Sequence, residues 1–564
     1  MNKSVVKLTP IGGQAEMGKS MYCLDINDHW FIIDAGYRFP EVDKLGVDVI
    51  IPDFNYLKDN KDKIEAIFIT HGHDDVMGAL PYLLQEVNVP IYTTDLTADL
   101  IDQLLQRYMR HSNVSYKYKI NRVNMNASLN IKGIEIELFP ITHSIPGSVG
   151  LAFLTPNGYV VYSSEFIIDF GAPEKFRCNI QKMMEIGKKG VLALLCESSY
   201  SKNDGYTSPS HKLTDKIESI FEDATGRIII TSYAQNAFRT QEIAQLAKKY
   251  NRKICFYGRD KYDNTNSIMR IARHTKKPIL DISQAYIADS KDIQNKRNMD
   301  KLVVLLSGSP RSIYHDILDI IDGGDEKLKL QDDDTFIVAS PVLPGTEKIA
   351  NRAINELYKT DTHIHVLKSK ELQSMHASQE DIKVLIQILN PKYFVPIKGE
   401  YQHFVAVSDI AKKMSVKDDH IVIVDNGEIV TFNNGKLQNY RDSIAIEDVM
   451  IDGLGIGDVG IKVIDDRNQL QNDGVVIIGM TIDGMTKEIV ANTDVQTRGF
   501  IYLKDSENIV KDIIDLAEKE LLVYKNDSNM DLREVRQTIK EKTNRYIVKE
   551  TGKKPVILPV IIEL

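Results

Sequence analysis

The stretch His71-Gly72-His73-Asp74-Asp75-Val76-Met77-Gly78 is the most informative part of this sequence, and it directly follows the apolar run Ala66-Ile67-Phe68-Ile69-Thr70. An apolar run of this length predicts a buried β-strand. His-x-His-x-Asp at the exit of a strand places two imidazoles and a carboxylate on one loop, and these groups are ligands for divalent metal ions. The glycines at 72 and 78 allow the backbone to turn tightly there. We therefore predict a metal-binding loop, with surface or hydrogen-bonded histidines as the ordinary alternative.

Other apolar runs also lead into ligand-type residues. Trp30 to Asp34 ends in a carboxylate, Glu135 to Pro140 precedes His143, and Gly158 to Tyr162 precedes Glu165. Each run has the pattern of a strand that ends in small and polar residues. From Ala79 to Val87 apolar residues recur at helical spacing, which predicts a helix behind the histidine loop. We expect the strand-end residues to converge on one metal centre, namely His71, His73, Asp75, His143 and Glu165.

Length and composition indicate a globular protein of several domains. The chain has 564 residues, of which 43% are apolar and 26% charged, and this predicts about three structural units. The four cysteines are far apart in sequence, which argues against a disulfide framework or a thiolate zinc site and fits a reducing cytoplasm. We find neither a signal peptide nor a run of roughly 20 apolar residues, so no membrane is expected. A net charge of −9 argues against a protein that coats nucleic acid by bulk charge, but allows a local basic channel.

Gly13 to Ser20 formally fits the phosphate-loop spacing Gly-x-x-x-x-Gly-Lys-Ser. The following residues, Met21 to Ile26, alternate like a strand, whereas a phosphate loop requires a helix at that point. We therefore do not expect nucleotide hydrolysis.

The order and spacing of these motifs resemble the metallo-β-lactamase fold, and Leu195 to Tyr200 resembles the motif that opens the inserted domain of β-CASP nucleases. Within that group the chain is similar to the ribonuclease J family over essentially its whole length. Further matching stretches are Ser374 to Glu380, Pro396 to Tyr401, Asp452 to Asp458 and Thr497 to Phe500.

The resemblance implies an α/β protein: a metallo-β-lactamase αββα sandwich with an inserted β-CASP α/β domain and a small C-terminal α/β domain. Alternating strand and helix patterns between 201 and 366 independently predict a parallel sheet covered by helices. We expect the metallo-β-lactamase domain at 1–205 and 367–432, the β-CASP domain at 206–366, a linker at 433–472, and a C-terminal oligomerisation domain at 473–564.

In active members of the family two divalent ions lie between the two larger domains. The match implies that His71, His73 and His143 hold the first ion and that Asp75 and Glu165 belong to the second position. Val76 and Lys398 stand where the family has two further histidine ligands. Valine has no donor atom and a lysine ammonium has no lone pair, so the second metal site is degenerate. We hypothesise that Lys398 replaces the second ion as a fixed cation, and the alternative is that its side chain points to solvent.

The remaining family machinery is partly kept. His376 matches the histidine that protonates the leaving 3′ oxygen, Glu197 is placed to orient it, and Asp75 completes the catalytic set. The family's pocket for a 5′-monophosphate matches Leu372, Gln373, Ser374, Met375 and His376, where Leu372 and Met375 replace a histidine and a glycine. In the insert Ser232 and Arg239 persist. A role as satisfied core groups is the alternative for each of these residues.

The resemblance is to the second, degenerate paralogue type, which assembles with an active ribonuclease J. It implies a 5′-to-3′ exoribonuclease, with endonuclease activity in some members, for rRNA maturation and mRNA decay, acting weakly here with one Mn²⁺ or Zn²⁺ ion per chain. Its expected partners are single-stranded RNA with a 5′-monophosphate end, an active paralogue, and further copies in a homodimer or hetero-oligomer. The alternative is a catalytically inactive subunit that supports the paralogue. Hydrolysis of a small lactam or thioester is disfavoured by the insert and the C-terminal unit.

Overall fold

The computed structural model describes residues 4–41, 44–258, 264–275, 279–294, 296–310, 312–343, 345–439, 442–453, 455–456, 460–500, 507–524 and 531–564. The chain divides into two compact units, Met1–Phe39 with Val49–Val449 and Pro40–Asp48 with Met450–Leu564. In the expected motif Asp452 to Asp458, the residues Leu454, Gly457 and Asp458 lie outside the described part.

The first sheet of the larger unit has the strand order β20-β19-β1-β2-β3-β5-β6-β7, and β21 also pairs with β19. Its strands are β1 (Val5–Gly12), β2 (Met21–Ile26), β3 (His29–Ile33), β5 (Ile64–Phe68), β6 (Ile91–Thr93), β7 (Ile120–Arg122), β19 (Glu428–Asn433), β20 (Lys436–Leu437) and β21 (Asp442–Ser443). β1 pairs antiparallel with β2 and β19, whereas β3, β5, β6 and β7 run parallel to one another. A short strand β4 (Val49–Ile51) follows β3 in sequence.

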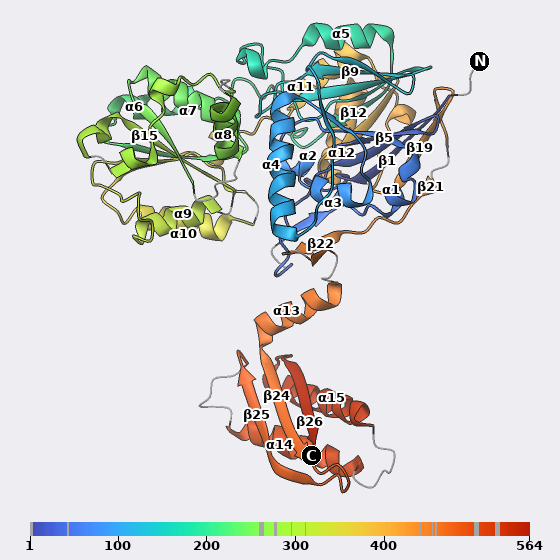
Figure 1. Cartoon of the computed structure of the whole chain (residues 1–564), viewed down its shortest axis with the longest axis vertical. Coiled ribbons are helices and arrows are strands. Elements are labelled where there is room, and N and C mark those ends of the chain that lie inside the picture. The colour runs from blue at the N-terminus through green and yellow to red at the C-terminus, as the bar shows by residue number, and fades with distance from the viewer. Residues whose placement is uncertain are drawn as a thin grey trace. The chain divides into compact units, whose positions relative to one another are not determined.

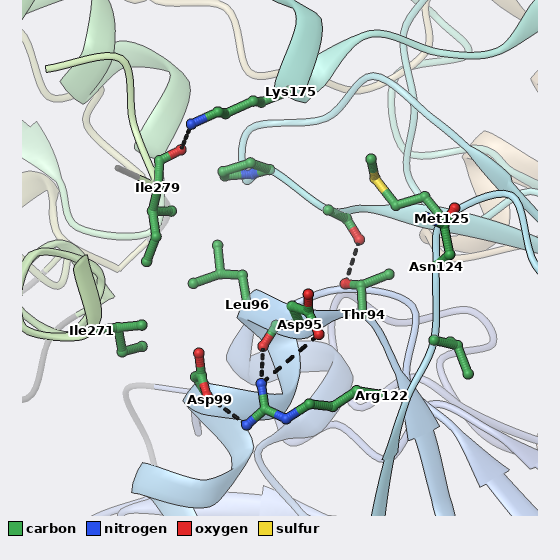
Figure 2. A pocket seen from close by; sticks show the side chains of 13 residues that line it. Thr94, Asp95, Leu96, Asp99, Arg122, Asn124, Met125, Lys175, Ile271 and Ile279 are labelled. Atoms are coloured by element: carbon green, nitrogen blue, oxygen red, sulfur yellow. Dashed lines mark hydrogen bonds and ion pairs between the residues drawn. The ribbon is translucent and has the colours of Figure 1, made fainter. Parts of the chain in front are cut away.

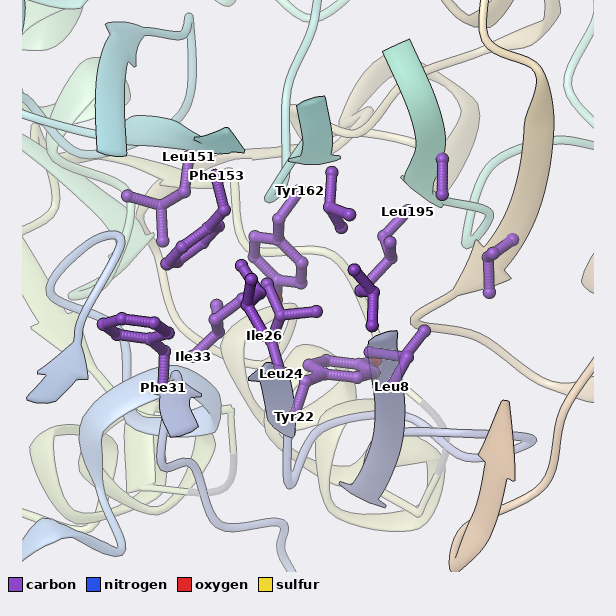
Figure 3. Close-up of a cluster of buried hydrophobic side chains, with 14 of the residues drawn as sticks. Leu8, Tyr22, Leu24, Ile26, Phe31, Ile33, Leu151, Phe153, Tyr162 and Leu195 are labelled. Atoms are coloured by element: carbon purple, nitrogen blue, oxygen red, sulfur yellow. The ribbon is translucent and has the colours of Figure 1, made fainter. Parts of the chain in front are cut away.

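A second sheet has the order β18-β12-β11-β10-β9-β8. Its strands are β8 (Ser128–Ile131), β9 (Ile134–Pro140), β10 (Val149–Thr155), β11 (Gly158–Tyr162), β12 (Val191–Glu197) and β18 (Tyr393–Ile397). The two sheets face each other, and Figure 3 shows side chains such as Leu24 and Phe31 of the first sheet against Phe153 and Tyr162 of the second. Removal of these apolar side chains from water stabilises the pairing of the sheets.

Helices cover the outer faces of both sheets (Figure 1). On the first-sheet side they are α1 (Asn55–Asp59), α2 (Asp74–Met77), α3 (Leu80–Glu86) and α4 (Asp95–Ser112), and on the second they are α5 (Ile180–Lys189), α11 (Gln379–Leu389) and α12 (Tyr401–Lys413). The outer-face residues Ile32 and Ile67 are fully buried, and the second sheet shares a core with α5, α11 and α12. The result is the αββα sandwich expected from the sequence.

The segment inserted between β12 and α11 forms a parallel sheet of order β14-β15-β13-β16-β17. Its strands are β13 (Ile228–Tyr233), β14 (Lys253–Tyr257), β15 (Leu302–Gly308), β16 (Thr335–Val338) and β17 (His363–Val366). Figure 1 shows α6 (Thr214–Asp223), α7 (Ala237–Lys249) and α8 (Asn264–Thr275) on one face, and α9 (Ser312–Ile321) and α10 (Glu347–Leu357) on the other. The predicted parallel sheet is confirmed, and its apolar strands fit burial on both faces.

The smaller unit contains a sheet of order β25-β24-β26, in which β24 (Val475–Ile482) pairs antiparallel with β25 (Ile489–Arg498) and parallel with β26 (Val556–Glu563). Helices α14 (Glu507–Tyr524) and α15 (Leu532–Thr551) pack on one face. The other face leaves Ile477, Leu558, Val560 and Ile562 exposed. The 433–472 range contains β20, β21, β22 (Val449–Asp452), β23 (Gly455–Ile456) and α13 (Ile461–Asp473), and the domain boundaries themselves stay predictions.

The glycine-bearing loop at 13–20 leads into β2, so a strand follows it as predicted. Lys19 is buried in this loop, where its Nζ lies 3.2 Å from Glu16 and hydrogen-bonds to Asp448. These carboxylates neutralise the charge of Lys19, which in a phosphate loop would bind the phosphates of a nucleotide. Among the described residues, no helix has both the length and the apolar character required to cross a bilayer.

Candidate metal centre

Four buried side chains converge at one edge of the sandwich. His71 and His73 follow β5, His143 follows β9, and Glu165 follows β11. Within the described residues they form a cluster whose potential ligand atoms all lie within 4.8 Å of one another. The strand ends predicted from the sequence are therefore brought together.

The separations between these atoms suit a bound ion. His73 Nδ1 lies 3.1 Å from His71 Nε2 and 3.3 Å from His143 Nε2, and Glu165 Oε2 lies 3.4 Å and 3.1 Å from the same two nitrogens. Two ligands held at about 2.0–2.1 Å from one ion are about 2.9–3.4 Å apart at coordination angles of about 90–110°. The observed separations fit that range.

The outer nitrogens of the three rings are engaged by neighbouring oxygens. His73 Nε2 donates to the carbonyl of Gln235 at 3.0 Å, and His143 Nδ1 donates to the carbonyl of Met375 at 2.9 Å. His71 Nδ1 lies 3.0 Å from Thr70 Oγ1, whose own proton is directed to Asp34. Each ring therefore carries its proton on the outer nitrogen, and three lone pairs point toward one another.

Burial keeps the His71 and His73 rings neutral. It lowers the pKa of His71 to about 3 and that of His73 well below the usual imidazole value. Neutral imidazoles are the metal-binding form. Three converging lone pairs and a carboxylate oxygen repel one another unless a cation lies between them, so the donor set fits one divalent ion.

Lys398 follows β18 and points into the centre. Its Nζ lies 2.8 Å from Glu165 Oε1, and its side chain is 4% exposed. Its backbone carbonyl accepts hydrogen bonds from the Ser198 N–H, the Ser198 hydroxyl and the Ser199 hydroxyl. The side chain does not point to solvent, so this alternative from the sequence is wrong.

Lys398 and Glu165 each stabilise the charged form of the other. Burial favours the neutral amine, but Glu165, Asp75 and Asp34 together raise the pKa of Lys398 above its usual range. Burial also opposes ionisation of Glu165, yet the neighbouring Lys398 ammonium holds its pKa well below the usual value. The pair is thus an ammonium and a carboxylate.

The expected second metal position does not fit an ion. Val76 is fully buried in α2 and offers no donor atom. Asp75 lies outside the four-residue cluster, and burial together with the charge of Glu165 raises its pKa well above the usual value. A valine side chain and an ammonium supply no donor atoms to a second cation.

Three residues around the centre have left-handed backbone conformations. Asp34, Ser164 and Lys398 have φ of 61°, 56° and 54°, and each lies just beyond the end of a strand. Such strain in residues other than glycine is characteristic of functional sites. It turns the backbone sharply at the end of each strand, and at Ser164 the turn is followed directly by Glu165.

His376 and Glu197 lie beside the metal cluster. Their Nδ1 and Oε2 atoms are 2.9 Å apart, and the ring centroids of His376 and His143 are 5.6 Å apart. Glu197 Oε1 accepts the backbone N–H groups of Phe166 and Ala377. Burial disfavours the imidazolium, but Glu197 outweighs it and raises the pKa of His376 to about 10. His376 is therefore protonated at neutral pH.

The residues expected to bind phosphate form a neighbouring group. Arg239 is buried, donates to the carbonyl of Gln373 at 3.3 Å, and its Nε has no hydrogen-bond partner among the described residues. Ser374 is half-buried, while Leu372, Met375 and Ser232 are buried. The Ser232 hydroxyl points to the carbonyl of Tyr233.

Several residues near the centre were not anticipated from the sequence. Lys216 extends to the carbonyl of Glu371 beside Arg239, and Gln235 contributes only its backbone oxygen. The Tyr200 ring stacks on His376 with centroids 5.2 Å apart. The carboxylate of Asp34 accepts hydrogen bonds from Thr70 and Tyr162, and its position at the end of a strand was the available signal. The sequence contains no comparable signal for the backbone contact of Gln235 or for the position of Lys216.

A separate pocket of about 640 Å³ lies behind the loop that follows His143. Figure 2 shows Arg122 bound to Asp95 and Asp99, and Lys175 bound to the carbonyl of Ile279. Pro146 and Gly147 line this pocket, but none of the metal-cluster residues does. It is therefore distinct from the centre.

Four family models match the chain. They are the metallo-beta-lactamase superfamily at 16–163, the ribonuclease J beta-CASP domain at 225–357, the Zn-dependent metallo-hydrolase RNA specificity domain at 368–423, and the ribonuclease J C-terminal domain at 462–564. These matches and the sheets described above confirm the expected fold class.

Individual proteins match over the same length. The chain is 30% identical to Ribonuclease J 2 of Staphylococcus aureus over 559 residues, covering 99% of this chain and 98% of that protein. It is also 30% identical to Ribonuclease J 2 of Staphylococcus saprophyticus over 563 residues, covering 100% and 99%. A solved structure of a protein of unknown function from Enterococcus faecalis V583 has a TM-score of 0.51 at 14% identity, covering 76% of this chain and 100% of that one. That last likeness concerns the fold alone.

Proposed function

The chain belongs to the ribonuclease J family, and on this premise we propose that it is a metal-dependent RNA hydrolase that works with one divalent ion, Mn²⁺ in preference to Zn²⁺. The observation that carries the proposal is the convergence of three imidazole lone pairs and a Glu165 oxygen within 4.8 Å of one another, with neighbouring atoms 3.1–3.4 Å apart. The proposed substrate is single-stranded RNA with a 5′-monophosphate end. It is degraded from 5′ to 3′, with internal cleavage as a secondary activity, in rRNA maturation and mRNA decay.

An ion held by His71, His73, His143 and Glu165 would supply Lewis-acid activation of water and of the phosphodiester. The side chains of this chain do the rest. The outer-nitrogen hydrogen bonds of the three histidines fix the orientation of their rings, which maintains the ligand geometry.

His376 is the proposed general acid. Its raised pKa keeps a proton available at neutral pH, and its ring adjoins His143. We propose that it protonates the 3′ oxygen that leaves when the phosphodiester is cleaved. Glu197 is a positioning residue, because its two oxygens engage His376 and the backbone at Phe166 and Ala377.

Arg239 is the proposed ligand for the terminal phosphate. A buried guanidinium with an unpartnered Nε retains donors for an anion. Lys216 adds a second positive charge nearby. Burial lowers the pKa of Lys216 most, and the charge of the neighbouring Arg239 lowers it further. Ser374 adds a half-buried hydroxyl. This arrangement supports recognition of a 5′-monophosphate.

We propose that the activity is weak. Family members with two ions share the activation of water and the stabilisation of the leaving group between them. Here Val76 and Lys398 do not hold a second ion, so the stabilisation that it would supply to the leaving group is lost.

The test is the decay of a 5′-monophosphorylated RNA in Mn²⁺, together with the metal content of the purified protein. His143→Ala removes one of the four ligands, so we expect loss of bound metal and a fall in rate at least as large as the roughly 10–100-fold that loss of an outer-shell partner costs. His29→Ala is the matched control, because His29 pairs with Glu65 away from the centre. RNA decay that is equal in His143→Ala and in the unchanged chain contradicts the proposal and indicates a contaminating nuclease.

The second candidate is a catalytically inactive subunit that supports an active ribonuclease J paralogue. The specific observations that favour it are the apolar Val76 and the inward Lys398 ammonium. Mixing the chain with the active paralogue distinguishes the two proposals. Stimulation of the paralogue that survives His71→Ala with His73→Ala, without RNA decay by this chain alone, supports the subunit.

We also propose that the C-terminal unit mediates assembly, as a homodimer or with the paralogue. The exposed apolar face at Ile477, Leu558, Val560 and Ile562 supports this role. The four cysteines are free and buried, which supports a reducing compartment and thus the cytoplasm.

A further inference from the structure

We propose that the Lys398 ammonium is the resident second cation of this centre, so that the chain holds at most one divalent ion. The inference rests on the metal site proposed above and deepens it. It concerns the position of Lys398 beside that site, where the side chains present do not offer ligands for a second ion.

The two oxygens of Glu165 face different partners. Oε2 lies among the imidazoles, 3.1 Å from His143 Nε2 and 3.4 Å from His71 Nε2, whereas Oε1 lies 2.8 Å from Lys398 Nζ. In two-metal centres the ions lie about 3.5–4 Å apart and share bridging ligands. Glu165 has the orientation of such a bridging carboxylate, but one of its two cations is an ammonium.

Lys398 is held in this position by its backbone. Its carbonyl accepts hydrogen bonds from Ser198 and Ser199, and the next residue, Gly399, has a φ of 143°. A side chain added at Gly399 would come within 2.9 Å of the Ser198 hydroxyl. The loop therefore has little freedom to turn the ammonium out to solvent.

A divalent ion and this ammonium cannot share the position. An ammonium offers three donors and no lone pair, so it repels an ion and ligates none. Val76, at the other position where the family has a histidine ligand, is fully buried and has no donor atom. Glu165 thus keeps a compensating charge even when the imidazole site holds no ion, just as Glu197 is compensated by His376.

The experiment compares metal content and thermal unfolding of the full chain in Mn²⁺ and in EDTA. We expect one Mn²⁺ per unchanged chain, and two in Val76→His with Lys398→His. In Lys398→Met the buried Glu165 loses its cation. The unfolding temperature of this variant should therefore fall most in EDTA and recover with Mn²⁺. The gap between the two conditions should be wider than in the unchanged chain.

Two further variants control for folding. Lys19→Met removes another buried lysine that pairs with a carboxylate, and it should lower the unfolding temperature equally in both conditions. Lys398→Met combined with Glu165→Gln removes both charges, so the extra dependence on Mn²⁺ should disappear.

Two Mn²⁺ ions in the unchanged chain would overturn the inference. So would a Lys398→Met variant whose dependence on Mn²⁺ is no greater than that of the unchanged chain. If the unchanged chain binds no ion but Lys398→Met shows the wider gap, the inference holds, whereas the proposed one-ion hydrolase fails.

Discussion

At the scale of single residues, Glu197 controls the charge of His376. The folded-state pKa of about 10 lies above the usual imidazole value of about 6.5. The protonated pair therefore stabilises the fold fully below a pH of about 6.5, and this contribution is lost as the pH rises through about 10.

Glu197→Gln should lower the pKa of His376 toward its usual value, because the counter-charge is removed while one oxygen remains for the backbone N–H groups. We expect the rate of RNA decay to fall above neutral pH, where His376 would no longer be protonated. NMR titration of the His376 ring measures the pKa directly. An unchanged pKa of His376 in the variant would show that burial and other charges, rather than Glu197, determine it.

The ligand residues could be predicted from the sequence better than their orientations. His71, His73, His143 and Glu165 each follow a recognisable strand, so their convergence was predictable. The direction of Lys398 was not, because a sequence does not reveal the positive φ or the three hydrogen bonds to its carbonyl. The fit of Asp75 as a ligand also depends on packing, which places it outside the cluster.

At the scale of secondary-structure elements, the loop carrying α2 packs against the end of β3 without room for side chains. Gly36 lies so close that an added Cβ would be 1.6 Å from the Asp75 carbonyl oxygen. The Ser20 N–H already donates to that oxygen, and the Ala35 N–H donates to the carbonyl of Val76. The histidine loop is thus fixed by backbone contacts.

Gly36→Ala should therefore displace α2 and destabilise the fold by about 1–3 kcal/mol or more, as overpacking does, and it should weaken metal binding. Chemical denaturation and metal content measure the two effects. Gly324→Ala is the matched control, because an added Cβ there would be 3.5 Å from its nearest neighbour. Equal stability of both variants would mean that the loop adapts without strain.

Element types were predictable wherever the hydrophobic pattern was regular. The strands of the parallel sheet and the long helices α7 and α10 carry such patterns, and their positions agree with the structure. Short elements such as α2, β20 and β21 have too few residues to show a period. Their conformation depends on the tertiary contacts.

At the scale of the whole molecule, the exposed face of the C-terminal sheet carries the proposal on assembly. Val560 and Ile562 are 44% and 53% exposed, and they lie beside Gly479 and Thr481 across the β24–β26 pair. Val560→Lys would place a charge among the exposed apolar side chains of this face, so we expect a shift to a smaller species with unchanged secondary structure. Light scattering after gel filtration measures the mass.

Tyr358→Lys provides the comparison, since Tyr358 is an exposed apolar residue of the other unit. If both variants keep the mass of the unchanged chain, assembly does not depend on this face. Domain order was predictable at this scale because each region has its own pattern. The exposed face was not, because β26 is apolar from Val556 to Ile562 and its sequence does not show which side is exposed.

Glu165 faces Lys398 with one oxygen and the imidazoles with the other. This arrangement also limits which substitutions the centre tolerates. Replacement of Lys398 alone leaves a buried carboxylate without its cation, and replacement of Val76 alone by histidine puts an imidazole into a fully buried position. Each single step toward a two-ion centre is therefore costlier than the paired step. We therefore expect a two-ion centre to arise in this sequence only when positions 76 and 398 change together.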